Sequence, residues 1–188
     1  MTYQVQHFFD SDTFTISYIV FNKETKSAVI IDPVYNFDYK TSTLTDESIK
    51  ELIEFIKKYQ LKIHYILETH IHADHITAAR ALKTYFPDTK LGAGERIIEV
   101  QKYFKNHLNL SNLADDGSQF DHLFLDKEKV ICDGLDFEVL FTPGHTPACV
   151  SYLFDDLVFV GDCIFMPDSG TGRCDFPGGA GEILFQSI

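Results

Sequence analysis

The sequence has few of the residues that define several classes of small protein. Its 188 residues include only four cysteines, and no two of them are spaced Cys-x-x-Cys, which excludes a zinc knuckle and a thioredoxin-type redox pair. No apolar run comes near the ~20 residues that a membrane-spanning helix needs. The N-terminal residues also lack a basic segment followed by an apolar stretch, the pattern of a secretory signal. We therefore expect a cytoplasmic protein with four free thiols.

Positive charge is also scarce. Lysine and arginine together number 16, against 28 aspartates and glutamates, which gives a formal net charge of −12. A field of that sign repels nucleic-acid phosphates and anionic lipids, so we expect neither nucleic acid nor a membrane as a partner. An acidic surface that serves only solubility explains the same charge.

What the sequence does contain is an alternation of strand-like and helix-like segments over the length of one domain. Apolar, β-branched stretches predict strands, and apolar residues at helical spacing predict helices. The predicted strands cover residues 14–21, 28–31, 63–67, 91–93, 137–142, 151–154 and 157–161. The predicted helices run from Thr45 or Asp46 to Tyr59, over 74–86 and over 95–104, and a last one begins at Gly181; residues 34–44 and 105–122 are expected to be irregular. The pattern indicates an α/β or α+β class.

The strongest local signal is the segment His70-Ile71-His72-Ala73-Asp74-His75, which directly follows a predicted strand. Residues two apart in an extended segment point the same way, so His70 and His72 can aim their imidazoles at one point. Asp74 stands where the cap of the next helix is expected, and its carboxylate can turn to the same cavity or to the helix amides. Imidazole and carboxylate together suit zinc, iron or manganese.

Two further residues follow strands in the same way. His145 lies in the turn Thr142-Pro143-Gly144-His145, and Asp162 follows the strand that ends at Gly161. Ligands at the ends of several strands converge at one edge of a sheet, where active sites are commonly built. We therefore expect His145 and Asp162 to join the histidine motif in a metal site. Cys163, the neighbour of Asp162, should point away from the metal into packing.

In these motifs the sequence resembles the metallo-β-lactamase superfamily. The resemblance covers nearly the whole chain, from Ile30-Ile31-Asp32-Pro33 through the histidine motif to Gly161-Asp162. It implies an αββα sandwich with a metal site at one edge of the two sheets. In the two-metal members, His70, His72 and His145 would hold one ion, Asp74, His75 and a later histidine the other, and Asp162 would bridge. No histidine follows His145, so residues 1–188 are expected to form a single domain truncated near its C-terminus, without the family's last strand and helices.

The segment Gly170-Thr171-Gly172-Arg173-Cys174-Asp175-Phe176 looks like the signature of one branch. It is similar to persulfide dioxygenases related to the ethylmalonic encephalopathy protein, in particular the bacterial β-lactamase-hydrolase-like group. This resemblance implies one Fe(II) per chain, held by His70, His145 and Asp162, a set that leaves positions open for substrate and O₂. His72, Asp74 and His75 would orient these ligands. Arg173 would bind a substrate carboxylate or hold its own loop, unless it pairs with Asp175 or Asp168. The implied reaction converts glutathione persulfide, O₂ and water to glutathione and sulfite.

Two alternatives stay open at this point. One is a zinc-dependent hydrolase of the glyoxalase II type, which cleaves a glutathione thioester with a metal-activated water. The other is a non-catalytic truncated remnant, whose uncovered apolar face a partner or a second subunit, as in a homodimer, would have to cover.

Overall fold

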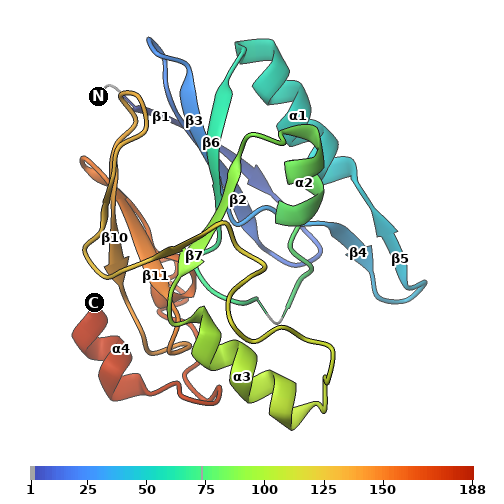
Figure 1. Cartoon of the computed structure of the whole chain (residues 1–188), viewed down its shortest axis with the longest axis vertical. Helices are drawn as coiled ribbons and strands as arrows, with labels where there is room; N and C mark the ends of the chain where they lie inside the picture. Colours follow the sequence, from blue (N-terminus) through green and yellow to red (C-terminus); the bar gives the residue numbers. More distant parts are fainter. Residues whose placement is uncertain (1–2, 73) are drawn as a thin grey trace. The chain divides into compact units, whose positions relative to one another are not determined.

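A parallel pair of central strands, β3 (Ser27–Ile31) and β6 (Lys62–Leu67), organises the first of two units into which the chain divides. The computed structural model describes residues 3–72 and 74–188. All five residues of β3 are buried, as expected of a strand covered on both faces. Two antiparallel strands, β2 (Ile16–Asn22) and β1 (Tyr3–Phe9), continue the sheet from β3, so its order in this unit is β1-β2-β3-β6 (Figure 1).

Two helices of the first unit flank this sheet. α1 (Glu47–Tyr59) buries Ile49, Leu52, Ile53 and Ile56, whose spacing places them on one face. It ends at Gln60, whose left-handed conformation (φ 54°) lets its N–H reach the carbonyls of the last turn. α2 (Ala79–Tyr85) follows β6 along the chain and lies beside it (Figure 1). A separate hairpin joins β4 (Asn36–Asp38) to β5 (Thr43–Thr45).

The second unit is built on another antiparallel sheet. Its order is β12-β11-β10-β9, and its four strands are β9 (Lys129–Val130), β10 (Phe137–Phe141), β11 (Val150–Phe154) and β12 (Leu157–Phe159). Aromatic rings fill its core, with Phe137 and Tyr152 packed edge to face at 5.9 Å between ring centroids. The unit also holds α3 (Ile97–His107), α4 (Gly181–Ser187), a short 3₁₀ turn (Gly161–Cys163) and β8 (His122–Phe124). β8 pairs in parallel with the last residues of β7 (Lys90–Gly94).

These elements confirm most of the predicted strands and helices. The strands predicted over 14–21 and 28–31 are β2 and β3, and the Lys26 N–H donates to the Asn22 carbonyl across the turn between them. The sequence did not predict β1, β4, β5, β8 and β9. Each of them is either only two or three residues long or, like β1, contains several polar residues. In the described residues no helix combines the length and apolar character needed to cross a membrane.

One prediction is wrong in a way that matters for the site. The helix predicted over 74–86 begins only at Ala79, so Asp74 does not cap it and His75 does not lie in it. The residues just before the helix are held against the segment after β3 instead: Thr77 forms a β-bridge with Val34, and the Ala78 N–H donates to the Pro33 carbonyl. The apolar spacing of Ile76, Ala79 and Leu82 fits a helix, but these two backbone contacts delay its start to Ala79.

The buried face of α1 gives a stability prediction. Leu52 is fully buried, so Leu52→Ala should lower the free energy of unfolding by about 2–5 kcal/mol through lost burial and a residual cavity. The neighbouring exposed Glu51 provides a matched control, and Glu51→Ala should change it by less than about 0.5 kcal/mol. Urea unfolding followed by circular dichroism measures both, and equal losses in the two variants would contradict the assigned face of α1.

Candidate metal centre

Three residues of the second unit bring their ligand atoms together. His70, His145 and Asp162 each offer one such atom, and the three atoms lie within 4.8 Å of one another. Asp162 Oδ2 lies 3.6 Å from His70 Nε2 and 3.4 Å from His145 Nε2. The two imidazole rings stand perpendicular with centroids 5.1 Å apart. Both histidines are buried, and the Asp162 side chain is one-third exposed, so the group opens to solvent on the carboxylate side.

The Nδ1 atoms of the two histidines, which face away from Asp162, limit which nitrogen can bind a metal ion. His145 Nδ1 lies 2.6 Å from the Arg173 carbonyl oxygen, which can only accept, so Nδ1 carries the hydrogen. Nε2 of a neutral His145 therefore presents its lone pair to the Asp162 carboxylate. His70 Nδ1 is likewise engaged, at 2.9 Å from Thr69 Oγ1. Facing acceptors repel unless a cation lies between them, and two imidazoles with one carboxylate suit zinc, iron or manganese. This group fits a metal ion.

Two glycines let the backbone close around the group. The Gly172 N–H donates to the Asp162 carbonyl at 3.0 Å, and a Cβ at Gly172 would lie 2.3 Å from that oxygen and 3.1 Å from His145 Nδ1. Gly161 has φ 51°, and a Cβ there would lie 2.3 Å from Thr69 Oγ1. Side chains at these positions would push the Asp162 turn away from both histidines. The Gly170–Phe176 signature is thus part of the wall of this group.

Arg173 contributes its backbone rather than its charge. Its guanidinium binds the Asp175 carboxylate through two contacts of 2.6 and 2.8 Å, and the side chain is 66% exposed. The pairing with Asp175 that the sequence left open is therefore present, and the role of Arg173 toward a substrate stays a prediction.

Cys163 lies in the short turn after Asp162 and is 1% exposed, and burial raises the pKa of its thiol. It occupies a packing position, as expected, although a 3₁₀ turn and not a strand places it there.

His72 belongs to the first unit and binds two buried carboxylates. Its Nε2 lies 3.2 Å from Asp32 Oδ1 and 3.2 Å from Glu68 Oε2. Burial of His72 opposes its protonation, but the charges and hydrogen bonds of these two carboxylates outweigh it and raise its pKa well above the ordinary value. Burial also raises the pKa of Glu68. Asp32 has φ 47°, a strained backbone for a non-glycine residue. These three residues form a metal-capable group as well as an ion cluster.

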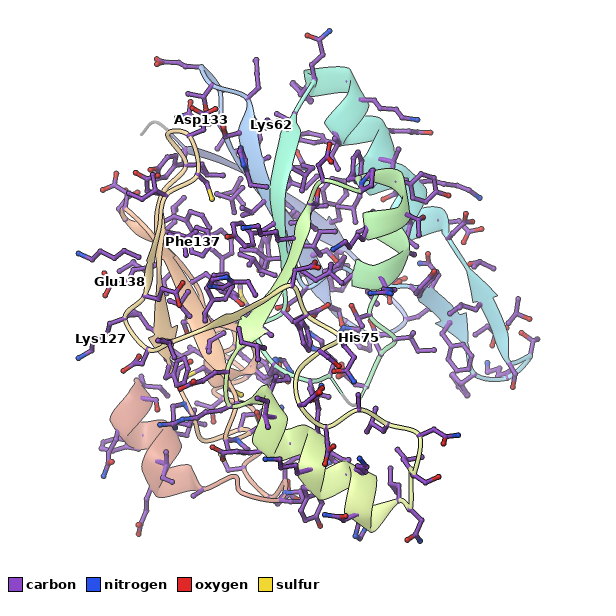
Figure 2. All side chains as sticks on the ribbon, in the orientation of Figure 1. Lys62, His75, Lys127, Asp133, Phe137 and Glu138 are labelled. Carbon is purple, nitrogen blue, oxygen red and sulfur yellow. The ribbon has the colours of Figure 1, made fainter. Side chains whose placement is uncertain are left out.

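His72 also shares a group with Asp74 and His75, whose ligand atoms lie within 4.8 Å of one another. His75 Nδ1 lies 3.0 Å from Thr15 Oγ1 and 3.4 Å from Asp74 Oδ2, and this contact lowers the pKa of Asp74 to about 2. His75 Nε2 is buried and has no hydrogen-bond partner within residues 3–72 and 74–188. Figure 2 shows His75 in the segment between β6 and α2. An unpartnered buried nitrogen beside a carboxylate also fits a cation.

The six predicted histidine and aspartate residues therefore fall into separate groups in the two units. Sequence reasoning missed the contributions of Asp32, Glu68, Thr69 and Gly172. Asp32 and Glu68 each follow a strongly apolar strand, the signal that singled out His70 and Asp162, and this signal could have marked them.

The contacts of Gly172 lead to a prediction about metal binding. Gly172→Ala should weaken metal binding by about 10–100-fold, the usual effect of disturbing the groups that hold metal ligands in place. Gly181→Ala is the matched control, since a Cβ there meets no atom within 4 Å. Competition with a chromophoric chelator measures the affinity, and equal affinities of the two variants would contradict the packing role of Gly172.

Comparison with known proteins identifies the family. The family model described as "Metallo-beta-lactamase superfamily" matches residues 12–188. The chain is 44% identical over 187 residues to "Glyoxylase B2" of Dictyostelium discoideum, covering 98% of the chain and 64% of that protein. It is 40% identical to a "Beta-lactamase hydrolase-like protein" of Agrobacterium fabrum (98% and 42% covered), and 27% identical to human "Persulfide dioxygenase ETHE1, mitochondrial" (98% and 61% covered).

A solved structure shows the same fold. The crystal structure of ETHE1 from Myxococcus xanthus has a TM-score of 0.75 and 29% identity, and covers 98% of this chain and 67% of that one. The metallo-β-lactamase fold expected from the sequence is therefore confirmed. The chain spans less than two-thirds of the length of the curated relatives described above. From the family match and this fold, we conclude that the chain belongs to the metallo-β-lactamase superfamily.

Proposed function

We propose that this chain is a mononuclear non-haem iron persulfide dioxygenase that oxidises glutathione persulfide. One Fe(II) would be held by His70, His145 and Asp162. The similarity to the human persulfide dioxygenase and the likeness to the bacterial ETHE1 structure support this proposal. So does the chemistry of the group, because two imidazoles and one carboxylate leave coordination positions open for a substrate and O₂.

The strongest support for the proposal is the contact between the Gly170–Phe176 segment and the proposed ligands. The Gly170–Phe176 segment, which distinguishes the persulfide dioxygenase branch by resemblance, touches two of the three proposed ligands directly. Gly172 N–H donates to the Asp162 carbonyl, and the Arg173 carbonyl accepts from His145 Nδ1. The segment that carries the sequence signature is therefore in direct contact with residues that would hold the ion.

The overall reaction balances as glutathione persulfide plus O₂ plus water giving glutathione plus sulfurous acid, which ionises to sulfite. The outer sulfur is oxidised, O₂ is reduced, and the sulfur–sulfur bond breaks. When bound, iron would supply the path for electrons between sulfur and oxygen. The residues of the chain would hold the ion. Burial raises the pKa of the Cys149 thiol to about 11, which favours the protonated thiol over the thiolate.

A zinc-dependent thioester hydrolase of the glyoxalase II type is the second candidate. The name of the 44% identical relative, "Glyoxylase B2", favours it. So does the separate group of His72, Asp74 and His75 in the first unit, which offers donors for a further ion. Two zinc ions per chain would support the hydrolase, and one iron would support the dioxygenase.

The reaction itself gives the decisive functional prediction. Anaerobically iron-loaded protein supplied with glutathione persulfide should consume O₂ and release sulfite in equal amounts. An oxygen electrode and a sulfite assay measure the two. Protein that is folded and iron-loaded, uses no oxygen with persulfide, and hydrolyses S-lactoylglutathione would show that the thioester hydrolase is the correct function.

The ligand set predicts how metal binding responds to histidine substitution. His145→Ala should weaken metal binding by more than about 100-fold, because it removes a ligand itself rather than a group behind one. His122→Ala is the matched control, since His122 pairs with Glu128 at 2.7 Å outside the proposed ligand set. Metal content after dialysis measures both. If His145→Ala keeps the wild-type content, His145 is not a ligand.

A further inference from the structure

A pocket lies in the first unit at the end of β6 that is opposite the histidine motif. Its volume is about 480 Å³, within the range of about 300–1,000 Å³ that is usual for small-molecule sites. It is lined by residues 61–65 at the start of β6, 85–90 from the end of α2 to the start of β7, and 131–132, all in the first unit. Glu68 follows the other end of β6, and six strand residues rise about 20 Å. The pocket is therefore separate from the residues of this unit that could hold an ion.

Two lysines supply the positive charge of the pocket. Lys62 is the first residue of β6 and Lys90 the first residue of β7, and both are exposed (Figure 2 labels Lys62). Lys90 Nζ lies 5.8 Å from the centre of the Tyr65 ring. Within residues 3–72 and 74–188, neither ammonium group forms an ion pair with a carboxylate. In a chain of net charge −12, two unpaired cations at one pocket favour an anionic ligand.

The charges of both lysines act on side chains of the pocket wall. Burial lowers the pKa of His64, and the charge of Lys62 lowers it further, which favours the neutral imidazole. Burial and the charge of Asp136 raise the pKa of Cys132 to about 11, and the charge of Lys90 opposes them. Both ammonium groups are therefore close to residues that line the pocket.

His64 occupies an irregular position in the strand. In the pairing of β3 with β6, Ala28 lies opposite Ile63 and Val29 lies opposite Tyr65, so His64 has no partner residue in β3. Such bulges re-aim a side chain and are frequent next to functional sites. His64 Nε2 is buried and has no hydrogen-bond partner in the part of the chain that the structure describes. A ligand oxygen that accepts a hydrogen bond from this nitrogen would remove the cost of leaving it unpaired.

The same pocket presents exposed apolar groups. Tyr85 and Ile131 both line it and are 55% and 80% exposed. Phe86 and Pro87, which follow Tyr85, line it as well. Aromatic and aliphatic side chains beside cations suit a ligand that carries its negative charge on a flat ring.

We propose that this pocket binds a phosphate monoester carried on a planar ring. The two ammonium groups match the nearly two negative charges of such a phosphate at neutral pH, and lysine binds phosphate as a point charge. The His64 imidazole would donate to a phosphate oxygen, and the ring would pack on Tyr85 and Ile131. Asp88 lines the pocket and Asp133 acts on His64, and these two acidic groups oppose an anion. No candidate metal ligand takes part, so the proposed function and this proposal can fail separately.

Titration with phenyl phosphate of metal-free protein that carries ¹³C-labelled isoleucine methyl groups tests the proposal. The methyl signal of Ile131, assigned with Ile131→Val, should shift with a Kd of about 1 mM or lower. Lys62→Met and Lys90→Met should each weaken binding about 10-fold, because a charge-assisted contact is lost. Asp88→Asn should strengthen it about 2–5-fold, because a like charge is removed.

Lys40→Met is the matched control and should leave the affinity unchanged. Lys40 Nζ lies 5.8 Å from the centre of the Tyr39 ring, as Lys90 Nζ does from Tyr65, but Lys40 does not line the pocket. Benzyl alcohol, a ring without the charge, and inorganic phosphate, the charge without a ring, should both bind more weakly than phenyl phosphate.

Three results would overturn the proposal. The first is an Ile131 methyl signal that does not shift at about 10 mM phenyl phosphate. The second is an affinity that Lys62→Met and Lys90→Met leave unchanged, or that Lys40→Met lowers equally. The third is binding of benzyl alcohol as tight as that of phenyl phosphate, which would show that the pocket does not select a charged ligand.

Discussion

The opposition between the Asp162 carboxylate and the lone pair of the His145 imidazole is the interaction on which the site depends. Asp162 Oδ2 lies 3.4 Å from His145 Nε2 and 3.6 Å from His70 Nε2, too far for good hydrogen bonds and close enough to share an ion. A neutral imidazole facing a carboxylate with its lone pair is unfavourable, so the fold must hold this arrangement by other contacts. Those contacts are the Arg173 carbonyl and the Thr69 hydroxyl on the outer ring nitrogens. A cation bound between the imidazole and the carboxylate would replace this repulsion by attraction to both groups.

In the first unit, a histidine meets carboxylates as a hydrogen-bond donor and not as a metal ligand. There the Nε2 of His72 donates to two buried carboxylates, so the histidine supplies the positive charge that a metal ion supplies elsewhere. The burial cost of Asp32 and Glu68 is offset internally, and the raised pKa of His72 expresses this compensation. His75, by contrast, keeps a buried nitrogen without a hydrogen-bond partner within the described residues. In the second unit, by contrast, the contact of Nδ1 with the Arg173 carbonyl fixes which nitrogen of His145 faces the carboxylate.

The sequence predicted the residues of the site better than the contacts that hold them. His70, His145 and Asp162 could be found because each follows an apolar strand, and the strands set where the residues emerge. The resemblance also implied that His72, Asp74 and His75 stand apart from this group. The contacts that hold His72 and the residues before α2 could not be predicted, since they depend on Thr77 bridging Val34 and on Asp32, which is distant in sequence. Helical spacing of Ile76, Ala79 and Leu82 suggested a helix that begins too early. The close approach of Gly172 to Asp162 likewise arises only when remote segments pack.

Iron K-edge X-ray absorption of wild-type protein, loaded anaerobically with one equivalent of Fe(II), tests the central claim most directly. We expect a single iron environment of nitrogen and oxygen donors, with the scattering pattern of two imidazoles and no sulfur. A metal–metal vector, a thiolate sulfur shell, or scattering from a single imidazole would contradict the assignment of His70, His145 and Asp162 as the ligands of one ion.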